Sequence, residues 1–309
     1  MYRYVVKRIF QLIPILLAVS FIVFYIVDLA PGDAIDAKYG SSLSVEEMDA
    51  MREEQGYNDP LVVRFVRYIK NVLEGDMGES ITYNMPVMKL YLNRLPATLK
   101  LAFWGIIVAL LISIPLGIFS AIHQNTAIDS AGTVLGLLGM SMPNFWFGLL
   151  LIMLFSGKLG LLPSYGDEKA VSVILPALTL GVGQAALLLR TTRSSMLEVI
   201  RQDYLRTARA KGVNERTVIY KHALKNALIP IITAAGTQMG IALGGSVVVE
   251  TVFAWPGVGK LTIDAFYSRD TDLVVCCLIL TTALSSILMV IIDIIYAYVD
   301  PRIKARYAK

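Results

Sequence analysis

Long apolar runs dominate the pattern of hydrophobic and polar positions along the chain. The runs cover residues 9–29, 98–122, 130–157, 170–189, 226–249 and 273–292. Each is close to or above the roughly 20 residues with which an α-helix crosses the hydrocarbon core of a bilayer. A chain in lipid must satisfy its own backbone hydrogen bonds, and a helix does so. The pattern therefore predicts six membrane-spanning helices.

The composition agrees with a membrane protein. Of the 309 residues, 56% are hydrophobic and only 17% are charged, whereas a soluble chain carries about 25% charged residues. A soluble enzyme, a disordered regulator and a disulfide scaffold are therefore disfavoured. Cys276 and Cys277 are adjacent in an apolar run, and the two histidines, His123 and His222, lie far apart. No His/Cys cluster has the spacing of metal ligands, so we expect no metal site. We also expect no catalytic residues in this chain.

Lys and Arg residues mark the flanks that would face the cytoplasm. Arg3, Lys7 and Arg8 precede the first run, and residues 302–309 after the last run are also basic. Residues 190–225, between the fourth and fifth runs, carry nine Lys/Arg against three acidic residues. This pattern places both ends of the chain and residues 190–225 in the cytoplasm. The turn after the second run, which holds Asp129 but no Lys or Arg, is an exception.

A polar insert, residues 31–95, separates the first two runs and would lie outside the cell. Its pattern predicts a short acidic helix over residues 46–54 and an amphipathic helix over residues 60–74. Asp59 is the expected N-cap of the second helix, and glycines in residues 75–78 indicate the turn that ends it. The insert is interpreted as a packed lid or spacer, a docking platform for an outside partner, or part of an outer gate.

A helical elbow is predicted in the basic cytoplasmic segment. Residues 203–211 are compatible with a helix, and Gly212 suits its C-terminal cap. Asn214 is then a suitable N-cap for a second helix that begins at Glu215. Small residues lie among basic ones in the first helix, where the sequence has Arg206, Ala208, Arg209, Ala210 and Lys211. The pattern favours a surface on which another protein docks, although an anchor on anionic lipid headgroups is the alternative.

The same segment carries a resemblance to a known family. Residues 204–230, YLRTARAKGVNERTVIYKHALKNALIP, resemble the cytoplasmic "EAA" loop of ABC-importer permeases. Ala208, Gly212 and Leu224 match the second alanine, the glycine and the leucine of that pattern. The departures from it, at Arg206, Thr207, His222 and Lys225, are typical of the dipeptide/oligopeptide/nickel branch.

Further motifs extend the resemblance over nearly the whole chain. They lie at residues 29–33 (LAPGD), 75–80 (GDMGES), 95–99 (LPATL), 141–146 (SMPNFW), 250–259 (ETVFAWPGVG) and 300–302 (DPR). Residues 269–273 depart from the branch, because Arg-Asp-Thr-Asp-Leu stands where Arg-Asp-Tyr-Pro-Val is usual. That departure bears on the outer end of the sixth span.

The resemblance implies an all-α integral membrane fold of the type I ABC importer permease. Six transmembrane helices are expected, with an extracytoplasmic insert between helices 1 and 2 and a cytoplasmic coupling-helix loop between helices 4 and 5. The implied divisions are an N-terminal tail with the first helix (1–30), the insert (31–95), the permease transmembrane domain (96–299) with its coupling loop (190–226), and a cytoplasmic tail (300–309).

The implied function is that of a permease subunit of an ATP-driven importer in a prokaryotic cell membrane. Its cargo would be di- or oligopeptides; the alternative within the same machinery is nickel or a metal chelate. The implied partners are a second permease subunit, two ABC ATPase subunits, an extracytoplasmic substrate-binding protein and membrane lipid, with no nucleic acid. ATP and magnesium would be bound by the ATPases, and we expect no cofactor and no catalysis in this chain. Residues 257–261 (GVGKL) lack the first glycine and the hydroxyl residue of a phosphate-binding loop.

Two sets of candidate site residues follow. The expected ATPase-coupling residues are Arg206, Ala208, Arg209, Lys211, Gly212, Asn214, His222 and Leu224. Polar residues within the spans are candidates for the substrate path, and they are Ser141, Asn144, Gln184, Gln238 and Ser246. Each of these polar residues is alternatively a helix-packing hydrogen bond.

Three rival classes remain to be weighed. A secondary transporter should carry ionisable residues in the middle of its spans and internal inverted repeats. A membrane-embedded enzyme should cluster His, Asp or Glu at one depth of the membrane. A membrane scaffold has no need of an elbow with this glycine spacing. Neither the mid-span ionisable residues and repeats nor the cluster is visible in the sequence, whereas the elbow is, so the importer permease is preferred.

Overall fold

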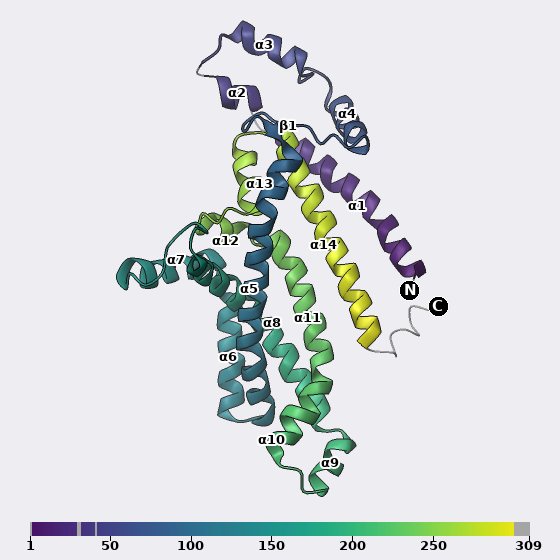
Figure 1. Cartoon of the computed structure of the whole chain (residues 1–309), viewed down its shortest axis with the longest axis vertical. Coiled ribbons are helices and arrows are strands. Elements are labelled where there is room, and N and C mark those ends of the chain that lie inside the picture. The colour runs from purple at the N-terminus through teal and green to yellow at the C-terminus, as the bar shows by residue number, and fades with distance from the viewer. Residues whose placement is uncertain (1, 30–31, 41, 300–309) are drawn as a thin grey trace.

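Helices dominate the computed structural model, which describes residues 2–29, 32–40 and 42–299 (Figure 1). The predicted cytoplasmic tail, residues 300–309, lies outside the described residues, as do Met1 and residues 30–31 and 41. Five helices in this part of the chain are long and apolar enough to cross a membrane. They are α1 (Tyr2–Leu29), α5 (Val87–Ile122), α8 (Ile174–Ile200), which follows a 3-10 turn η2 (Ala170–Val173), α11 (Leu224–Gly245) and α14 (Thr271–Val299).

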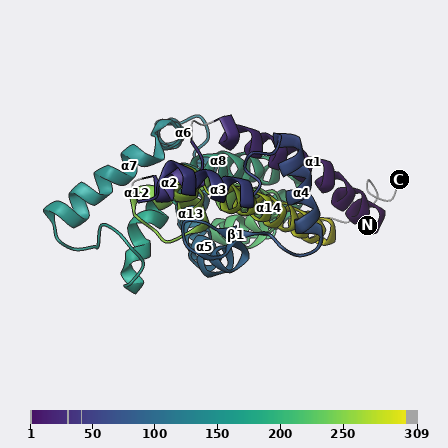
Figure 2. The same cartoon turned by 90° about the horizontal axis from the view of Figure 1, so that it is seen from above.

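The third predicted span is broken, so the expectation of one continuous helix over residues 130–157 is wrong. The segment forms α6 (Ala127–Ser141), then α7 (Asn144–Leu151), which continues as a π-helical stretch η1 (Ile152–Lys158). Met142 between them is extended, with φ −77° and ψ 125°, because the ring of Pro143 disfavours a helical conformation in the preceding residue. Both views show α7 projecting sideways from the bundle (Figures 1 and 2).

The helices α5 and α8 form the centre of the bundle. They approach closely because glycines face each other, and a Cβ on Gly181 would lie 2.7 Å from the carbonyl oxygen of Gly105. Bulkier residues at these positions would separate the two backbones. The helix α5 begins at Val87, within the predicted insert, and spans 36 residues. It therefore runs from the insert to the opposite end of the bundle.

The outer insert holds the two helices that its pattern predicts. They are α3 (Val45–Glu54) and α4 (Leu61–Leu73), and a short α2 (Ala34–Tyr39) and an antiparallel pair, β1 (Glu79–Ser80) and β2 (Met85–Pro86), complete it. Phe65 of α4 packs edge-on against Phe21 and Phe24 of α1, with ring centroids 5.1 and 5.8 Å apart. The expected N-cap role of Asp59 is wrong, because Pro60 occupies the cap position without a side-chain bond. The Asp59 carboxylate instead pairs with Arg67.

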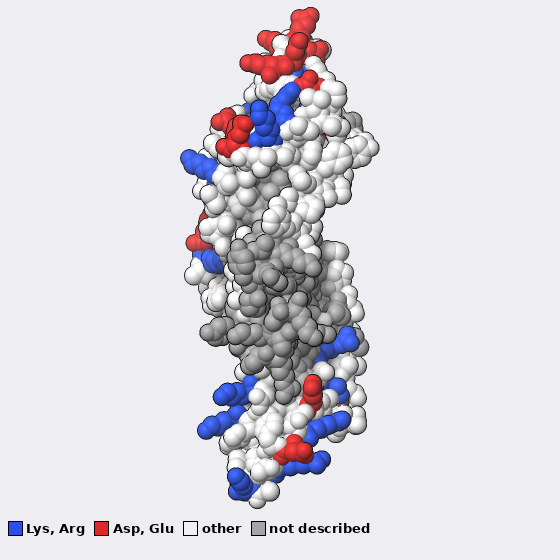
Figure 3. Space-filling model, turned by 90° about the vertical axis from the view of Figure 1, so that its right-hand side faces the viewer, with Lys and Arg blue, Asp and Glu red and all other residues white. Residues whose placement is uncertain are grey.

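The outer end of the bundle also contains α12 (Val247–Val252) and α13 (Val258–Tyr267). At the opposite end lie α9 (Asp203–Ala210), α10 (Glu215–Thr217) and a π-helical stretch η3 (Val218–Ala223) that leads into α11 (Figure 1). On the face shown in Figure 3, acidic side chains gather at the end that carries the insert and basic ones dominate the end that carries α9. This distribution agrees with a basic cytoplasmic end.

Candidate functional site

The predicted elbow is present between α9 and α10. The helix α9 ends at Ala210, and Gly212 has a φ of +76°, the left-handed conformation that glycine adopts at little cost. The Gly212 N–H donates to the Arg209 carbonyl oxygen at 2.9 Å. Asn214 caps the next helix, since its Oδ1 accepts a hydrogen bond from the Arg216 N–H at 2.9 Å. Both predicted caps are therefore confirmed. The second helix begins at Glu215 as predicted, and it continues through η3 into α11.

An ion pair closes the elbow. The Arg209 guanidinium donates to both oxygens of Glu215 at 2.8 and 3.0 Å, and these hydrogen bonds raise the pKa of Arg209. Arg209 is therefore already paired within the chain. Since the pair is largely exposed, it sets the shape of the turn more than the stability of the fold.

The other predicted coupling residues differ in how far they face outward. Arg206 and Lys211 are exposed, and the space beside Gly212 is open, since a Cβ placed there would meet nothing within 4 Å. Ala208 is half-buried and packs against a cluster around the fully buried Leu205. Leu224 packs against the same cluster, and His222 is half-buried. The elbow therefore has an outer surface of basic and small residues above an apolar base.

Two polar links, which the sequence reasoning missed, attach this end of the chain to its neighbours. The first joins α9 and α11, because Asn226 Nδ2 donates to Tyr204 Oη at 2.7 Å. The second joins α6 and α8, where Arg193 donates to both oxygens of Asp129, each at 2.7 Å. In the sequence, Asp129 is notable only as an acidic residue in a turn without Lys or Arg. Its counter-ion is 64 residues away in sequence.

The environment of Asp129 makes this second link strong. Its side chain is only 7% exposed, and it also accepts hydrogen bonds from Ser120 Oγ and from the Asn125 N–H. The hydrogen bonds from Arg193 and Ser120 hold the pKa of Asp129 well below its usual range. The carboxylate thus stays charged and joins the turn after α5 to α8, which leads to α9.

A cavity of about 380 Å³ lies at the break between α6 and α7. Asn144 and Gln184, both candidates for the substrate path, line it. Gln184 is 7% exposed, and its Oε1 has no hydrogen-bond partner among the described residues. Its Nε2 lies 3.5 Å from the backbone oxygen of Gln238, a third candidate. The structure thus brings three of the five path candidates together.

The remaining two path candidates do not line this cavity. Ser141 is exposed at the end of α6, next to the break. Ser246 is fully buried and donates to the Glu250 carboxylate at 2.9 Å. Since a buried hydroxyl that is already paired has no free polar group to offer, Ser246 serves the packing of α12 in this structure.

Two family profiles match the chain. Residues 113–305 match the binding-protein-dependent transport system inner membrane component, and residues 1–102 match the N-terminal region of a binding-protein-dependent transport system membrane component.

Curated relatives align over almost their whole length. The oligopeptide transport system permease protein AppB of Bacillus subtilis is 41% identical over 315 residues, covering 98% of this chain and 100% of the relative. The glutathione transport system permease protein GsiC of Salmonella paratyphi A is 41% identical, with 98% and 99% covered. The dipeptide transport system permease protein DppB of Alkalihalophilus pseudofirmus is 36% identical, with 98% and 100% covered.

Solved structures share the fold. A chain of the methionine ABC transporter MetNI in an inward-facing conformation superposes with a TM-score of 0.61 at 21% identity, covering 70% of this chain and 98% of that one. An amino acid ABC transporter in complex with histidines gives a TM-score of 0.51 at 16% identity, covering 70% and 94%.

Proposed function

The chain belongs to the family of binding-protein-dependent transport system inner membrane components, and we propose that it forms the path along which di- or oligopeptides enter a prokaryotic cell. It is a multi-pass permease subunit of an ABC importer. Importers of this kind work with ATPase and substrate-binding subunits. The observation that carries the peptide proposal is 36–41% identity over 98% of the chain to permeases named for oligopeptide, dipeptide and glutathione transport.

The proposed assembly pairs this chain with a second permease subunit and two ABC ATPases. ATP and magnesium would be bound by the ATPases, and this chain would hydrolyse nothing. A sequence without a phosphate-binding loop supports that division of labour. The N- and C-termini would lie in the cytoplasm together with α9, and the basic residues that flank the first and last spans in the sequence support this orientation.

The elbow between α9 and α10 is proposed as the docking site of an ATPase. Arg206 and Lys211 present unburied positive charge for acidic groups of the partner, and the open side of Gly212 admits its surface closely. Arg209 and Asn214 would act indirectly by holding the shape of the turn. The apolar base of Ala208, Leu224 and Leu205 would keep α9 attached to the bundle.

A displacement of the elbow would be transmitted to the cavity between α6 and α7 through a short series of contacts. The buried side chain of Leu205 fixes α9 on the core that α8 shares. The ion pair of Arg193 with Asp129 transmits movement of α8 to α6, and α6 ends at the break where Asn144 and Gln184 lie. Rigid helices that shift against each other in this way are a common basis of alternating access.

Peptides suit the cavity better than nickel does. The amide groups of Asn144 and Gln184 can exchange hydrogen bonds with a peptide backbone, and Gln184 Oε1 is an acceptor that has no partner among the described residues. Nickel would favour imidazole or thiolate ligands. The relatives named above transport peptides or glutathione, which also disfavours the nickel alternative.

Reconstitution of the complete importer tests the proposal. The chain would be co-expressed with its second permease, ATPases and binding protein and incorporated into liposomes. Uptake of di- and tripeptides that requires ATP and is not competed by nickel chelates is the expected result. Uptake of nickel chelates without uptake of peptides would contradict it.

A further inference from the structure

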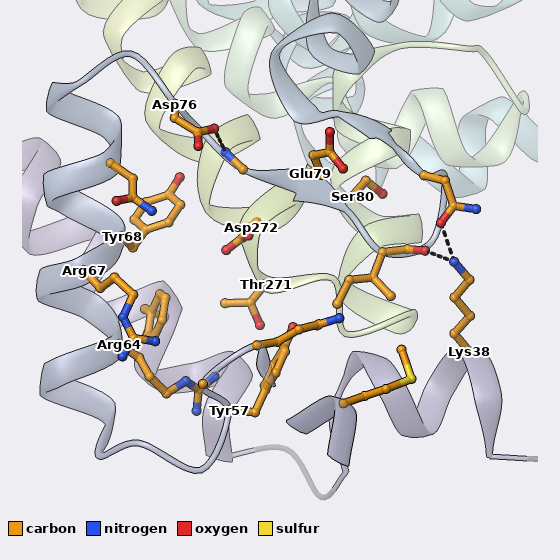
Figure 4. A pocket seen from close by; sticks show the side chains of 18 of the residues that line it. Lys38, Tyr57, Arg64, Arg67, Tyr68, Asp76, Glu79, Ser80, Thr271 and Asp272 are labelled. Carbon is orange, nitrogen blue, oxygen red and sulfur yellow. Dashed lines mark hydrogen bonds between the residues drawn. The ribbon is translucent and has the colours of Figure 1, made fainter. Parts of the chain in front are cut away.

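A second cavity, of about 450 Å³, lies in the outer insert (Figure 4), at the opposite end of the molecule from the elbow (Figure 1). Its walls come from α2, α3 and α4, from the β1–β2 turn and from the first turn of α14. Its volume is within the range of sites that bind small molecules. The α14 wall belongs to residues 269–273, the segment in which this sequence departs from the branch it resembles.

Asp272 lies at the centre of this cavity. It belongs to the first turn of α14, is half-buried, and faces the open space (Figure 4). The Gly78 backbone covers it so closely that a Cβ on Gly78 would lie 2.6 Å from Asp272 Oδ2. Within the described ranges the Asp272 carboxylate has no hydrogen bond and no ion pair. A carboxylate partly withdrawn from water without a partner is costly, and a bound cation would relieve that cost.

Tyr68 of α4 provides a second, independent observation. Its side chain is 7% exposed and lines the same cavity. Its Oη is buried without a hydrogen-bond partner among the residues that the structure describes. Figure 4 shows the ring beside the space that Asp272 faces. A phenol oxygen and a carboxylate that both lack partners and share one cavity indicate a ligand with several hydrogen-bond donors.

The basic side chains of the cavity already have partners within the chain, although Lys38 keeps its positive charge because both of its acceptors are neutral. Lys38 Nζ donates to Asn84 Oδ1 at 2.6 Å and to the Ile81 carbonyl oxygen. Arg64 donates to Asp28 at 2.5 Å, and Arg67 pairs with Asp59. The acidic groups are less engaged, because Asp76 accepts only from the Gly78 N–H and Asp272 accepts from none of the described groups. Among the charged groups of the cavity that the structure describes, the carboxylates therefore keep the most capacity to accept hydrogen bonds from a ligand.

We propose that this outer cavity binds the primary ammonium group of a small ligand between the Asp272 carboxylate and Tyr68 Oη. An ammonium group brings three donors and no acceptor, so it can donate to both oxygens. Tyr57 also lines the cavity, and the Arg64 guanidinium already lies 5.1 Å from the centre of its ring. Its acidic residues do not form a cluster of three metal-ligating groups within the described part of the chain, so an ammonium suits the cavity better than a divalent cation. The identity of the ligand rests on the proposed peptide function: it is the free amino terminus of an incoming peptide.

Binding of three small probes to the purified importer complex, without its binding protein and in lipid nanodiscs, tests this assignment. The probes are Ala-Ala, N-acetyl-Ala-Ala and ethylamine. Ala-Ala should bind at least about tenfold more tightly than its acetylated form, the difference expected for one charged hydrogen-bonded pair. Asp272→Asn should remove that preference, and Tyr68→Phe should reduce it severalfold. Glu74→Gln, an exposed change on the same insert, should leave it intact.

Equal binding of both peptides to the wild-type complex, or an unchanged preference in Asp272→Asn, would overturn the assignment. If Asp272→Asn fails to fold, Tyr68→Phe still tests the assignment, because that change keeps the ring and removes only the hydroxyl. An unchanged preference for the free amino terminus in Tyr68→Phe would then overturn it. Peptide uptake by the complete importer is measured separately. Ethylamine binding that depends on Asp272, together with no peptide uptake, would leave the ammonium site standing and remove the peptide function. Peptide uptake without amino-terminal preference in binding would do the reverse.

Discussion

Thr98 Oγ1 donates a hydrogen bond to Glu250 Oε1 across 2.8 Å, joining the outer part of α5 to α12. Glu250 has no exposed surface, and it also accepts from Ser246 Oγ and from the Lys260 N–H, each at 2.9 Å. Thr98 Oγ1 accepts in turn from the Val258 N–H at the start of α13. One buried carboxylate thus holds three outer elements together with neutral donors.

Glu250→Gln should destabilise the chain although it preserves the shape of the side chain. A glutamine offers one acceptor oxygen and one amide donor, so either Thr98 and Ser246 or the Lys260 N–H loses its acceptor. We expect a loss of about 1–3 kcal/mol, the cost of leaving a buried donor unpaired. Thermal unfolding of the purified chain in detergent checks this, with the exposed Glu54→Gln as the matched control. Equal melting temperatures of the two variants would contradict the role of Glu250.

Asp129→Asn should weaken the link between α6 and α8. It leaves Arg193 without its carboxylate partner, and we expect a loss of about 2–3 kcal/mol, typical of a hydrogen bond to a charged group. Unfolding in denaturant measures it, with Glu198→Gln on the exposed face of α8 as the control. A variant as stable as that control would show that the pair contributes nothing.

The same pair predicts a dependence of stability on pH. The pKa of Asp129 is lowered in the folded chain from about 3.9 in an unfolded one. Its contribution is therefore fully present above about pH 4 and is lost as the pH falls through the folded pKa. The stability difference between the wild type and Asp129→Asn should shrink below about pH 4. A difference that stays constant down to pH 2 would argue against it.

Gln184→Leu should reduce transport without reducing the stability of the chain. Because Gln184 Oε1 has no partner in the described structure, replacing it with an apolar group should leave the melting temperature unchanged or raise it. Peptide uptake should fall about 2- to 10-fold, the worth of one neutral hydrogen bond. Thr179→Val on the same helix is the control, since that hydroxyl only donates to the Leu175 carbonyl oxygen. Undiminished uptake by Gln184→Leu would remove this residue from the path.

Local chemistry made the elbow and the insert helices predictable from the sequence. Gly212 and Asn214 are residues whose backbone and side-chain preferences suit those caps in almost any context. The amphipathic spacing around Phe65 likewise predicted α4. The broken third span was harder, because the run over residues 130–157 is apolar whether or not the helix is continuous. Pro143 was visible there, but a proline is also tolerated within a membrane helix.

Relationships over long distances were not predictable. The ion pair of Asp129 with Arg193 and the hydrogen bond of Thr98 with Glu250 form only when the helices pack together. The environment of Asp272 depends on Tyr68 and Gly78, which lie in separate parts of the insert. For Ser246 the sequence left two roles open, part of a path or a helix-packing hydrogen bond, and in the structure its hydroxyl pairs with a buried carboxylate.

The central claim is that the elbow at Gly212 receives an ATPase, and Gly212→Trp tests it most directly. Gly75 in the outer turn is a matched control, since it also has a positive φ, +91°, and open space beside it. Both tryptophan variants should enter the membrane in normal amount. ATPase co-purification and ATP-driven uptake should fall by about tenfold or more in Gly212→Trp, as for a clash above ~1.4 kcal/mol, and should persist in Gly75→Trp. Normal co-purification and uptake by Gly212→Trp would contradict the claim.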